Sequence, residues 1–118
     1  MIQLTPHMRI ILGVEPADFR KGIDGLAQIC RGVLNSDPFS GYLFVFMNKR
    51  KTSIKMLNYD GQGFWMFQKR LSKGRFKWWP NKKDRVSVSL LMHELQLLMW
   101  NGDPGSVNTA PFWKKIPI

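Results

Sequence analysis

Lysine and arginine side chains gather in one third of this 118-residue chain, between residues 48 and 85. That stretch holds twelve of the 18 bases but two of the eight acids, so bases and acids balance in the remainder. Seven aromatic residues are interleaved with these bases. Basic side chains attract phosphates, and aromatic rings stack on nucleobases. The pattern therefore predicts a polyanionic partner with stackable bases, that is, a nucleic acid, and it leaves DNA and RNA as alternatives.

Three groups of residues are the candidate contacts for such a partner. Residues 49–51 are expected at the tip of a hairpin, and a second basic cluster follows between residues 69 and 77. Arg20 and Lys21 lie in the first turn of an expected helix, where free amide groups also attract phosphate. Trp79 joins them because strand alternation places it beside two of the bases, exposed for stacking. The predicted nucleic-acid-binding residues are Arg20, Lys21, Lys49, Arg50, Lys51, Lys55, Lys69, Arg70, Lys73, Arg75, Lys77 and Trp79.

Each group also has a purely structural interpretation. A charged hairpin tip can be no more than a solvated turn, and Arg20 can pair with Asp24, four residues further on. Most of the aromatic residues are expected in the core, with neighbouring bases that serve solubility. We favour binding because the charge is concentrated in one segment instead of being spread along the chain.

The acidic residues give weak support for catalysis. A two-metal nuclease needs several carboxylates that converge on one cleft, whereas most of the eight acids fit caps, turns or positions before proline. Asp24 is the least explained, so a metal-dependent nuclease built on Asp18, Asp24 and Asp60 is the third hypothesis. Metalloprotease, phosphate-loop and zinc motifs are absent, and a single cysteine cannot form a disulfide within the chain. We expect no enzyme activity, no cofactor and no metal.

Apolar patterning predicts a sheet. Residues 9–14 and the continuously apolar residues 42–47 are expected as strands, the second of them central in the sheet. Alternation over residues 52–59 and 63–69 predicts two more strands, which complete a three-stranded meander. A fourth alternating piece spans residues 75–79. An edge strand is also expected over residues 86–88.

Two helices are expected, over residues 19–34 and 90–100, with Asp18 and Ser89 as their N-caps. The first helix contains Gly22 and Gly25, which cost about 1 kcal/mol each against alanine. They fit only if another backbone or a ligand approaches closely there, or if the helix begins later. The predicted fold class is α+β, a single domain with a mainly antiparallel sheet of about five strands covered by two helices.

The domain is expected to span residues 1–104, with a basic β-meander at 42–80 and a C-terminal tail at 105–118. The first residues lack the charged-then-apolar order of a signal peptide, and no apolar run approaches the ~20 residues that a membrane span needs. We therefore expect a cytoplasmic protein without a membrane partner.

Four ordered motif blocks resemble those of a known family. Residues 18–26 read D-F-R-K-G-I-D-G-L, and residues 37–41 read D-P-F-S-G, with L-F-V-F and N-K-R shortly after. Residues 59–65 read Y-D-G-Q-G-F-W, and residues 69–80 contain K-R-L, K-G-R-F and W-W-P. Over about residues 9–80 the chain resembles the TnpB accessory proteins of insertion sequence 66 elements, the products of their second open reading frame. Phe19 stands where that family more often has methionine.

The resemblance implies a part in the transposition of a mobile element, beside a separate and larger transposase. It implies no catalytic residues, and it makes the transposase and other proteins of the element expected partners. Two main hypotheses follow. In the first, the protein is a non-catalytic accessory factor that binds element DNA with little sequence specificity. In the second, it docks on the transposase through its apolar last helix.

Overall fold

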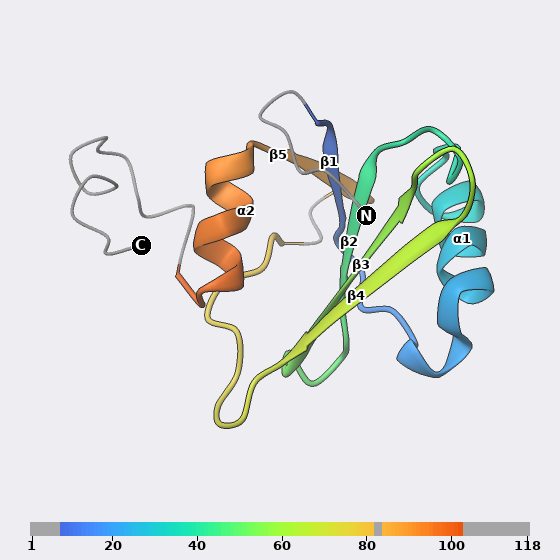
Figure 1. Ribbon diagram of the computed structural model, residues 1–118. Coiled ribbons are helices and arrows are strands. Elements are labelled where there is room, and N and C mark those ends of the chain that lie inside the picture. The colour runs from blue at the N-terminus through green and yellow to red at the C-terminus, as the bar shows by residue number, and fades with distance from the viewer. Residues whose placement is uncertain (1–7, 82–83, 103–118) are drawn as a thin grey trace.

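A five-stranded sheet with one helix on each face forms the centre of the molecule (Figure 1). The computed structural model describes residues 8–81 and 84–102. Its strands are β1 (Ile10–Gly13), β2 (Leu43–Met47), β3 (Ser53–Tyr59), β4 (Phe64–Arg70) and β5 (Ser87–Leu90), and they lie in the order β4-β3-β2-β1-β5. β1 and β2 are parallel, and the other neighbours are antiparallel. The predicted α+β class with a mainly antiparallel sheet is confirmed.

β2 is buried along its whole length, as its continuously apolar sequence predicts. Phe44 and Phe46 pack toward α1 (Gly22–Gly32), together with Leu57 of β3. The alternate residues of β2 pack in a second cluster with Leu98 of α2 (Met92–Met99). The two helices therefore cover opposite faces, and each face has its own apolar cluster.

The parallel pair brings two loops to one end of the sheet. β1 and β2 are joined through α1 and run in the same direction, so both strands end at the same side. The Ala17 amide donates a hydrogen bond to the Met47 carbonyl over 2.9 Å. This bond holds the segment that follows β1 across the end of β2. The carboxyl ends of parallel strands are a common place for ligand sites, which makes this end a candidate site.

The expected strand at residues 75–79 is absent, although its aromatic residues are packed. β4 and β5 lie at opposite edges of the sheet, and side chains of the described residues 71–81 pack on the face that α2 covers. Phe76 is 3% exposed in the cluster on that face, and Trp78 and Trp79 pack against the same cluster. These rings fill the core from a connecting segment, and a fifth strand forms later, at β5.

Both helices begin later than the sequence suggests. Residues 19–21 form a separate 3₁₀ turn, η1 (Phe19–Lys21), which Asp18 caps as predicted by accepting a hydrogen bond from the Arg20 amide. The cap predicted at Ser89 is wrong, because Ser89 pairs with Ile11 in β5. α2 begins at Met92 instead. The Glu94 carboxylate accepts a hydrogen bond from the backbone amide of the residue before Met92.

Gly22 and Gly25 have separate structural roles. Gly22, at a φ of +66°, makes the turn between η1 and α1, which is a conformation that other residues adopt at a cost. At Gly25 the Lys21 side chain crosses the helix, so that a Cβ would lie 2.1 Å from the Lys21 Cβ. Of the conditions that the sequence set for these glycines, the later helix start is met. The group that approaches Gly25 is the Lys21 side chain, and not another backbone or a ligand.

We expect Gly25→Ala to lower the free energy of unfolding by about 1–3 kcal/mol, because the added methyl group forces the backbone or the side chain at position 21 to move. Alanine otherwise stabilises a helix by about 1 kcal/mol over glycine. Gly32→Ala in the same helix is the matched control, since a Cβ there meets nothing within 4 Å. Urea denaturation should show a loss for the first variant and a small gain for the second. A gain at both positions would contradict the packing of position 21 against Gly25.

Within the described ranges, no helix has the length and apolar character to cross a membrane. The tail expected at residues 105–118 lies outside the residues that the structure describes, as do residues 103 and 104 of the expected domain.

Candidate nucleic-acid interface

The turn between β2 and β3 presents three consecutive cations to solvent. Lys49, Arg50 and Lys51 are all exposed, and the preceding Asn48 fixes the backbone beneath them. The Asn48 Oδ1 accepts hydrogen bonds from the amides of residues 52 and 53, and its Nδ2 donates to the hydroxyl of Thr52. Sequence reasoning missed this structural role, although an asparagine before a turn is the available signal.

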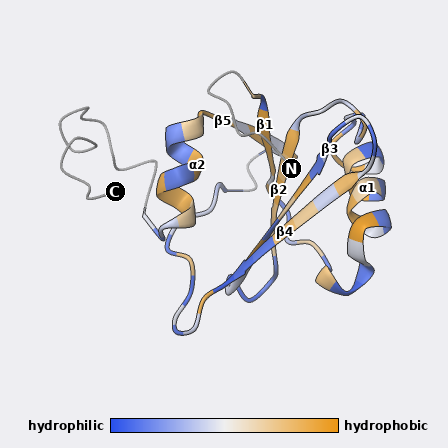
Figure 2. Cartoon of the chain, viewed as in Figure 1, coloured by the Kyte–Doolittle hydropathy of each residue, from blue (hydrophilic) through white to orange (hydrophobic). Residues whose placement is uncertain are grey.

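The segment after β4 lies against the same turn. The Leu71 amide donates to the Thr52 carbonyl over 2.9 Å, and the Phe76 amide donates to the Lys51 carbonyl over 2.8 Å. Residues 72–75 therefore project from the same end of the sheet, together with the last residue of β4. Figure 1 shows the β2–β3 turn and the loop after β4 at one end of the molecule, and Figure 2 shows that both are hydrophilic.

An open hollow separates the β2–β3 turn from η1. It has a volume of about 670 Å³ and is lined by residues 16–20 on one side and 48–50 on the other. Arg20 reaches this hollow from η1, and Lys49 and Arg50 reach it from the turn. We call the exposed cations at this end of the molecule the basic end: Arg20, Lys49, Arg50, Lys51, Arg70, Lys73 and Arg75.

Arg20 pairs with Asp18, and not with Asp24 as the structural interpretation of the sequence suggested. The Arg20 Nε lies 3.1 Å from the Asp18 Oδ1, and its Nη2 lies 3.1 Å from the Oδ2. Hydrogen bonds from the Arg20 side chain, followed by that from its amide, lower the pKa of Asp18 to about 2. Asp18 is therefore anionic at neutral pH and offsets part of the charge on Arg20, so the β2–β3 turn carries the less compensated cations.

Lys55 is turned inward and is removed from the candidate contacts. Its side chain is 6% exposed, its Nζ donates to the Phe19 carbonyl over 2.9 Å, and the same nitrogen lies 5.0 Å from the centre of the Phe19 ring. An ammonium group needs such partners when it is buried. Lys55 thus ties η1 to β3 and positions Arg20 beside the hollow.

Three other predicted contacts, Lys69, Lys77 and Trp79, are not part of the basic end, and each donates a hydrogen bond to another part of the protein. The Lys69 Nζ donates to the Met99 carbonyl at the end of α2. Lys77 is exposed, and its amide donates to the Asn101 side chain over 2.7 Å. Trp79 is not the exposed stacking residue that alternation predicted, because its segment is not a strand. Its indole Nε1 donates to a backbone carbonyl beside β1 over 3.0 Å.

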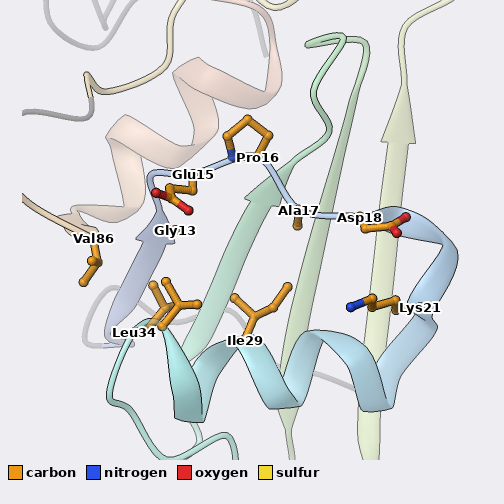
Figure 3. Close-up of a pocket in the computed structure, with 10 residues that line it drawn as sticks. Gly13, Glu15, Pro16, Ala17, Asp18, Lys21, Ile29, Leu34 and Val86 are labelled. Atoms are coloured by element: carbon orange, nitrogen blue, oxygen red, sulfur yellow. The ribbon is translucent and has the colours of Figure 1, made fainter.

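Lys21 faces a different, smaller pocket. Figure 3 shows its side chain pointing toward Ile29, in the space between α1 and the segment that follows β1. This pocket has a volume of about 140 Å³, and Asp18 lines both it and the larger hollow. The structure therefore separates Lys21 from Arg20, although the two are consecutive in the sequence.

The three acids of the nuclease hypothesis are not brought together. Asp18 lies at the basic end, whereas Asp60 lies in the hairpin at the far end of β3. The Asp60 Oδ1 accepts hydrogen bonds from the amides of residues 62 and 63, and its Oδ2 accepts one from the Trp65 indole. Across residues 8–81 and 84–102, no three side chains of histidine, cysteine, aspartate or glutamate form a group that could hold a metal ion.

Fold and surface define the class of this protein: a small, basic α+β domain whose cations gather at one end of a mixed sheet. The chain belongs to the IS66 Orf2-like protein family, which it matches over residues 8–107. This family places it among the accessory proteins of insertion sequences, and it confirms the resemblance seen in the motifs.

Two relatives come from Sinorhizobium fredii (strain NBRC 101917 / NGR234). "Uncharacterized protein y4jC" is 34% identical over 111 residues, which cover 94% of this chain and 93% of that protein. "Uncharacterized protein y4hO" is 33% identical over 89 residues, which cover 75% of this chain and 77% of that protein. No solved structure matches the chain.

Proposed function

We propose that this protein is a non-catalytic accessory factor of transposition that binds the DNA of its element through the basic end. The observation that supports the proposal is the gathering of exposed cations from η1, the β2–β3 turn and the loop after β4 at one end of the sheet. Those of η1 and the β2–β3 turn line one open hollow. Flexible lysine and arginine side chains on turns contact phosphates more readily than base edges. The binding is therefore expected to discriminate weakly between sequences.

A salt titration tests the proposal. We would measure the affinity for three probes of equal length: a duplex from the element end, a random duplex, and single-stranded DNA. About six phosphate contacts predict a loss of affinity of about a thousandfold between roughly 50 and 200 mM salt. The two duplexes should bind within about tenfold of each other, since most contacts go to phosphates. Undetectable binding at low salt, or tight binding that does not respond to salt, would refute the proposal.

Lys51 offers a test that couples binding to stability. Its φ is +61°, and its amide donates to the Asn48 carbonyl across the turn. Glycine and asparagine adopt this left-handed conformation at a lower cost than lysine does. We expect Lys51→Gly to raise the free energy of unfolding by about 0.5–1 kcal/mol. The same variant should reduce the slope of log affinity against log salt by about one.

Lys51→Asn is the control for backbone flexibility, because asparagine tolerates a positive φ but removes the charge. Urea denaturation and DNA titration on both variants should show weaker binding with unchanged or raised stability. Variants that bind DNA as tightly as the parent protein would show that position 51 makes no phosphate contact.

A second candidate function, docking on the transposase, is favoured by two exposed apolar residues near the ends of α2. Leu91 is 62% exposed and Trp100 is 60% exposed, whereas Leu95, Leu97 and Leu98 are buried. The interface expected from the sequence is thus reduced to those two positions. A pull-down from a nuclease-treated lysate distinguishes the two functions. Recovery of the transposase without nucleic acid, and its loss in a Leu91→Ser/Trp100→Ser variant, would support docking.

A further inference from the structure

Edge strand β4 carries an aromatic pair that belongs to neither core cluster among the described residues. The rings of Trp65 and Phe67 are parallel within 7°, and their centres lie 6.0 Å apart. Trp65 is 36% exposed. Phe67 is half-buried. A large ring on a sheet normally packs against a neighbouring element, so an exposed tryptophan stacked on a half-buried phenylalanine is an unusual use of apolar surface on an edge strand.

Strand register places the pair on the face of the sheet that α2 covers. Trp65 pairs with Asn58, and Phe67 pairs with Met56, which packs against the cluster on the α2 face. That cluster draws its described members from the other four strands, α2 and the segments beside them, and none from β4. The helix therefore covers the middle of the sheet and leaves the aromatic pair at its margin.

Asp60 fixes the orientation of the Trp65 ring. Its Oδ2 accepts a hydrogen bond from the indole Nε1 over 2.7 Å, while its Oδ1 is held by two backbone amides of the hairpin. Those two amide bonds, and then the indole bond, lower the pKa of Asp60 to about 2. The carboxylate is ionised at neutral pH and holds the ring in place. A ring fixed in this way loses little conformational entropy when a partner stacks on it.

The same strand leads from the aromatic pair to the basic end. Arg70 lies three residues beyond Phe67, which is about 10 Å along a strand. Strand alternation places Arg70 on the opposite face, so a bound strand would cross the sheet edge to reach it. The bases of the loop that follows β4 lie further in the same direction. Aromatic rings beside a line of cations are the combination that binds single-stranded nucleic acid, since the rings stack on bases and the cations follow the phosphates.

We propose that Trp65 and Phe67 form a stacking platform for unpaired bases of a DNA strand whose phosphates lie on the basic end. The proposal rests on the proposed function and adds a substrate class to it: DNA with a single-stranded portion, such as a frayed or cut end. A protein segment is the less favoured occupant, because the cations at the end of β4 and in the loop after it complement phosphates.

The test compares oligothymidine with a duplex of the same length. The variants are Trp65→Leu and Phe67→Leu, alone and together, since leucine keeps apolar bulk but removes the aromatic face. Trp100→Leu is the matched control, because it removes an exposed tryptophan outside the platform. We expect each platform variant to weaken oligothymidine binding about tenfold and to change duplex binding less than twofold. The salt dependence should stay the same, since no cation is removed.

A second measurement does not depend on the variants. Ultraviolet crosslinking of the parent protein to oligothymidine that contains iodouracil should place the crosslinked base on the peptide with residues 64–68. A crosslink that maps elsewhere overturns the platform. So does unchanged oligothymidine binding by the double platform variant, or a platform variant that loses transposase capture from nuclease-treated lysate but keeps its affinity for oligothymidine.

The failure of the platform and the failure of the proposed function are distinguishable. If a Lys49→Glu/Arg50→Glu variant loses affinity for both probes while the platform variants lose none, the basic end binds DNA and the platform does not. If the parent protein binds neither probe at low salt, both proposals are refuted.

Discussion

Replacing Lys49 and Arg50 together by glutamate is expected to lower the affinity for duplex DNA about a hundredfold near 0.1 M salt. Both side chains are exposed at the β2–β3 turn and line the open hollow, without a described acid bonded to either. Each phosphate contact contributes roughly tenfold at this salt concentration, through the counterions that it releases. The slope of log affinity against log salt should therefore fall by about two.

Arg9→Glu/Arg31→Glu is the matched control, because it changes the net charge by the same amount at the opposite end of the sheet. Arg9 precedes β1 and lies over the Tyr42 ring, and Arg31 lies near the end of α1 over the Phe39 ring. Affinity and salt dependence measured for both variants separate a local surface from net charge. Equal losses in the two variants would show that the protein attracts DNA by its overall charge without using the basic end.

The second large effect is a loss of folding stability, expected from Asn58→Asp. Asn58 is 3% exposed, and its Nδ2 donates to the carbonyls of Gly41 and Tyr42 over 2.9 and 3.2 Å. The substitution keeps the shape of the side chain but turns two donors into a carboxylate that faces two carbonyl oxygens. An uncompensated buried charge costs about 3–5 kcal/mol. A loss of that size removes much of the stability of a small domain.

Asn35→Asp is the control for this change, since Asn35 is exposed at a φ of +50°, where aspartate is also tolerated. Chemical denaturation should show a change within about 0.5 kcal/mol for the control and a large loss for the buried position. Near-equal stability of the two variants would mean that the Asn58 amide does not hold the start of β2 to β3.

The continuous apolar run of β2 and the alternation of β3 and β4 predicted the meander. A strand that is buried on both faces is apolar throughout, and a strand that is buried on one face alternates. The connection at residues 75–79 misled the same reasoning. Its bases and aromatics alternate like a strand, but its rings turn into the core from a segment that crosses a sheet face. Local spacing reports which side chains are buried, and it does not report whether the backbone is paired.

At the candidate interface, the hairpin tip was predictable because three consecutive bases follow a strand and a turn residue. The inward turn of Lys55 was not, because it depends on the Phe19 carbonyl, 36 residues away in the chain. Lys21 and Arg20 are adjacent in the sequence, yet their side chains line different pockets. The exposure of Trp65 could not be predicted from spacing, because it depends on the edge position of β4, which only the pairing order of the strands reveals.

β1 pairs on both sides, with β2 from the middle of the chain and with β5 from residues 87–90. All four residues of β1 are buried. A fragment that stops before Ser87 therefore leaves one side of a wholly apolar strand without hydrogen-bond partners, a template to which another fragment can add. A nascent chain has the same open side until β5 leaves the ribosome, so this side of β1 is paired late in synthesis. Truncation of the chain shortly before Ser87 should therefore give an aggregating product and not a smaller active one.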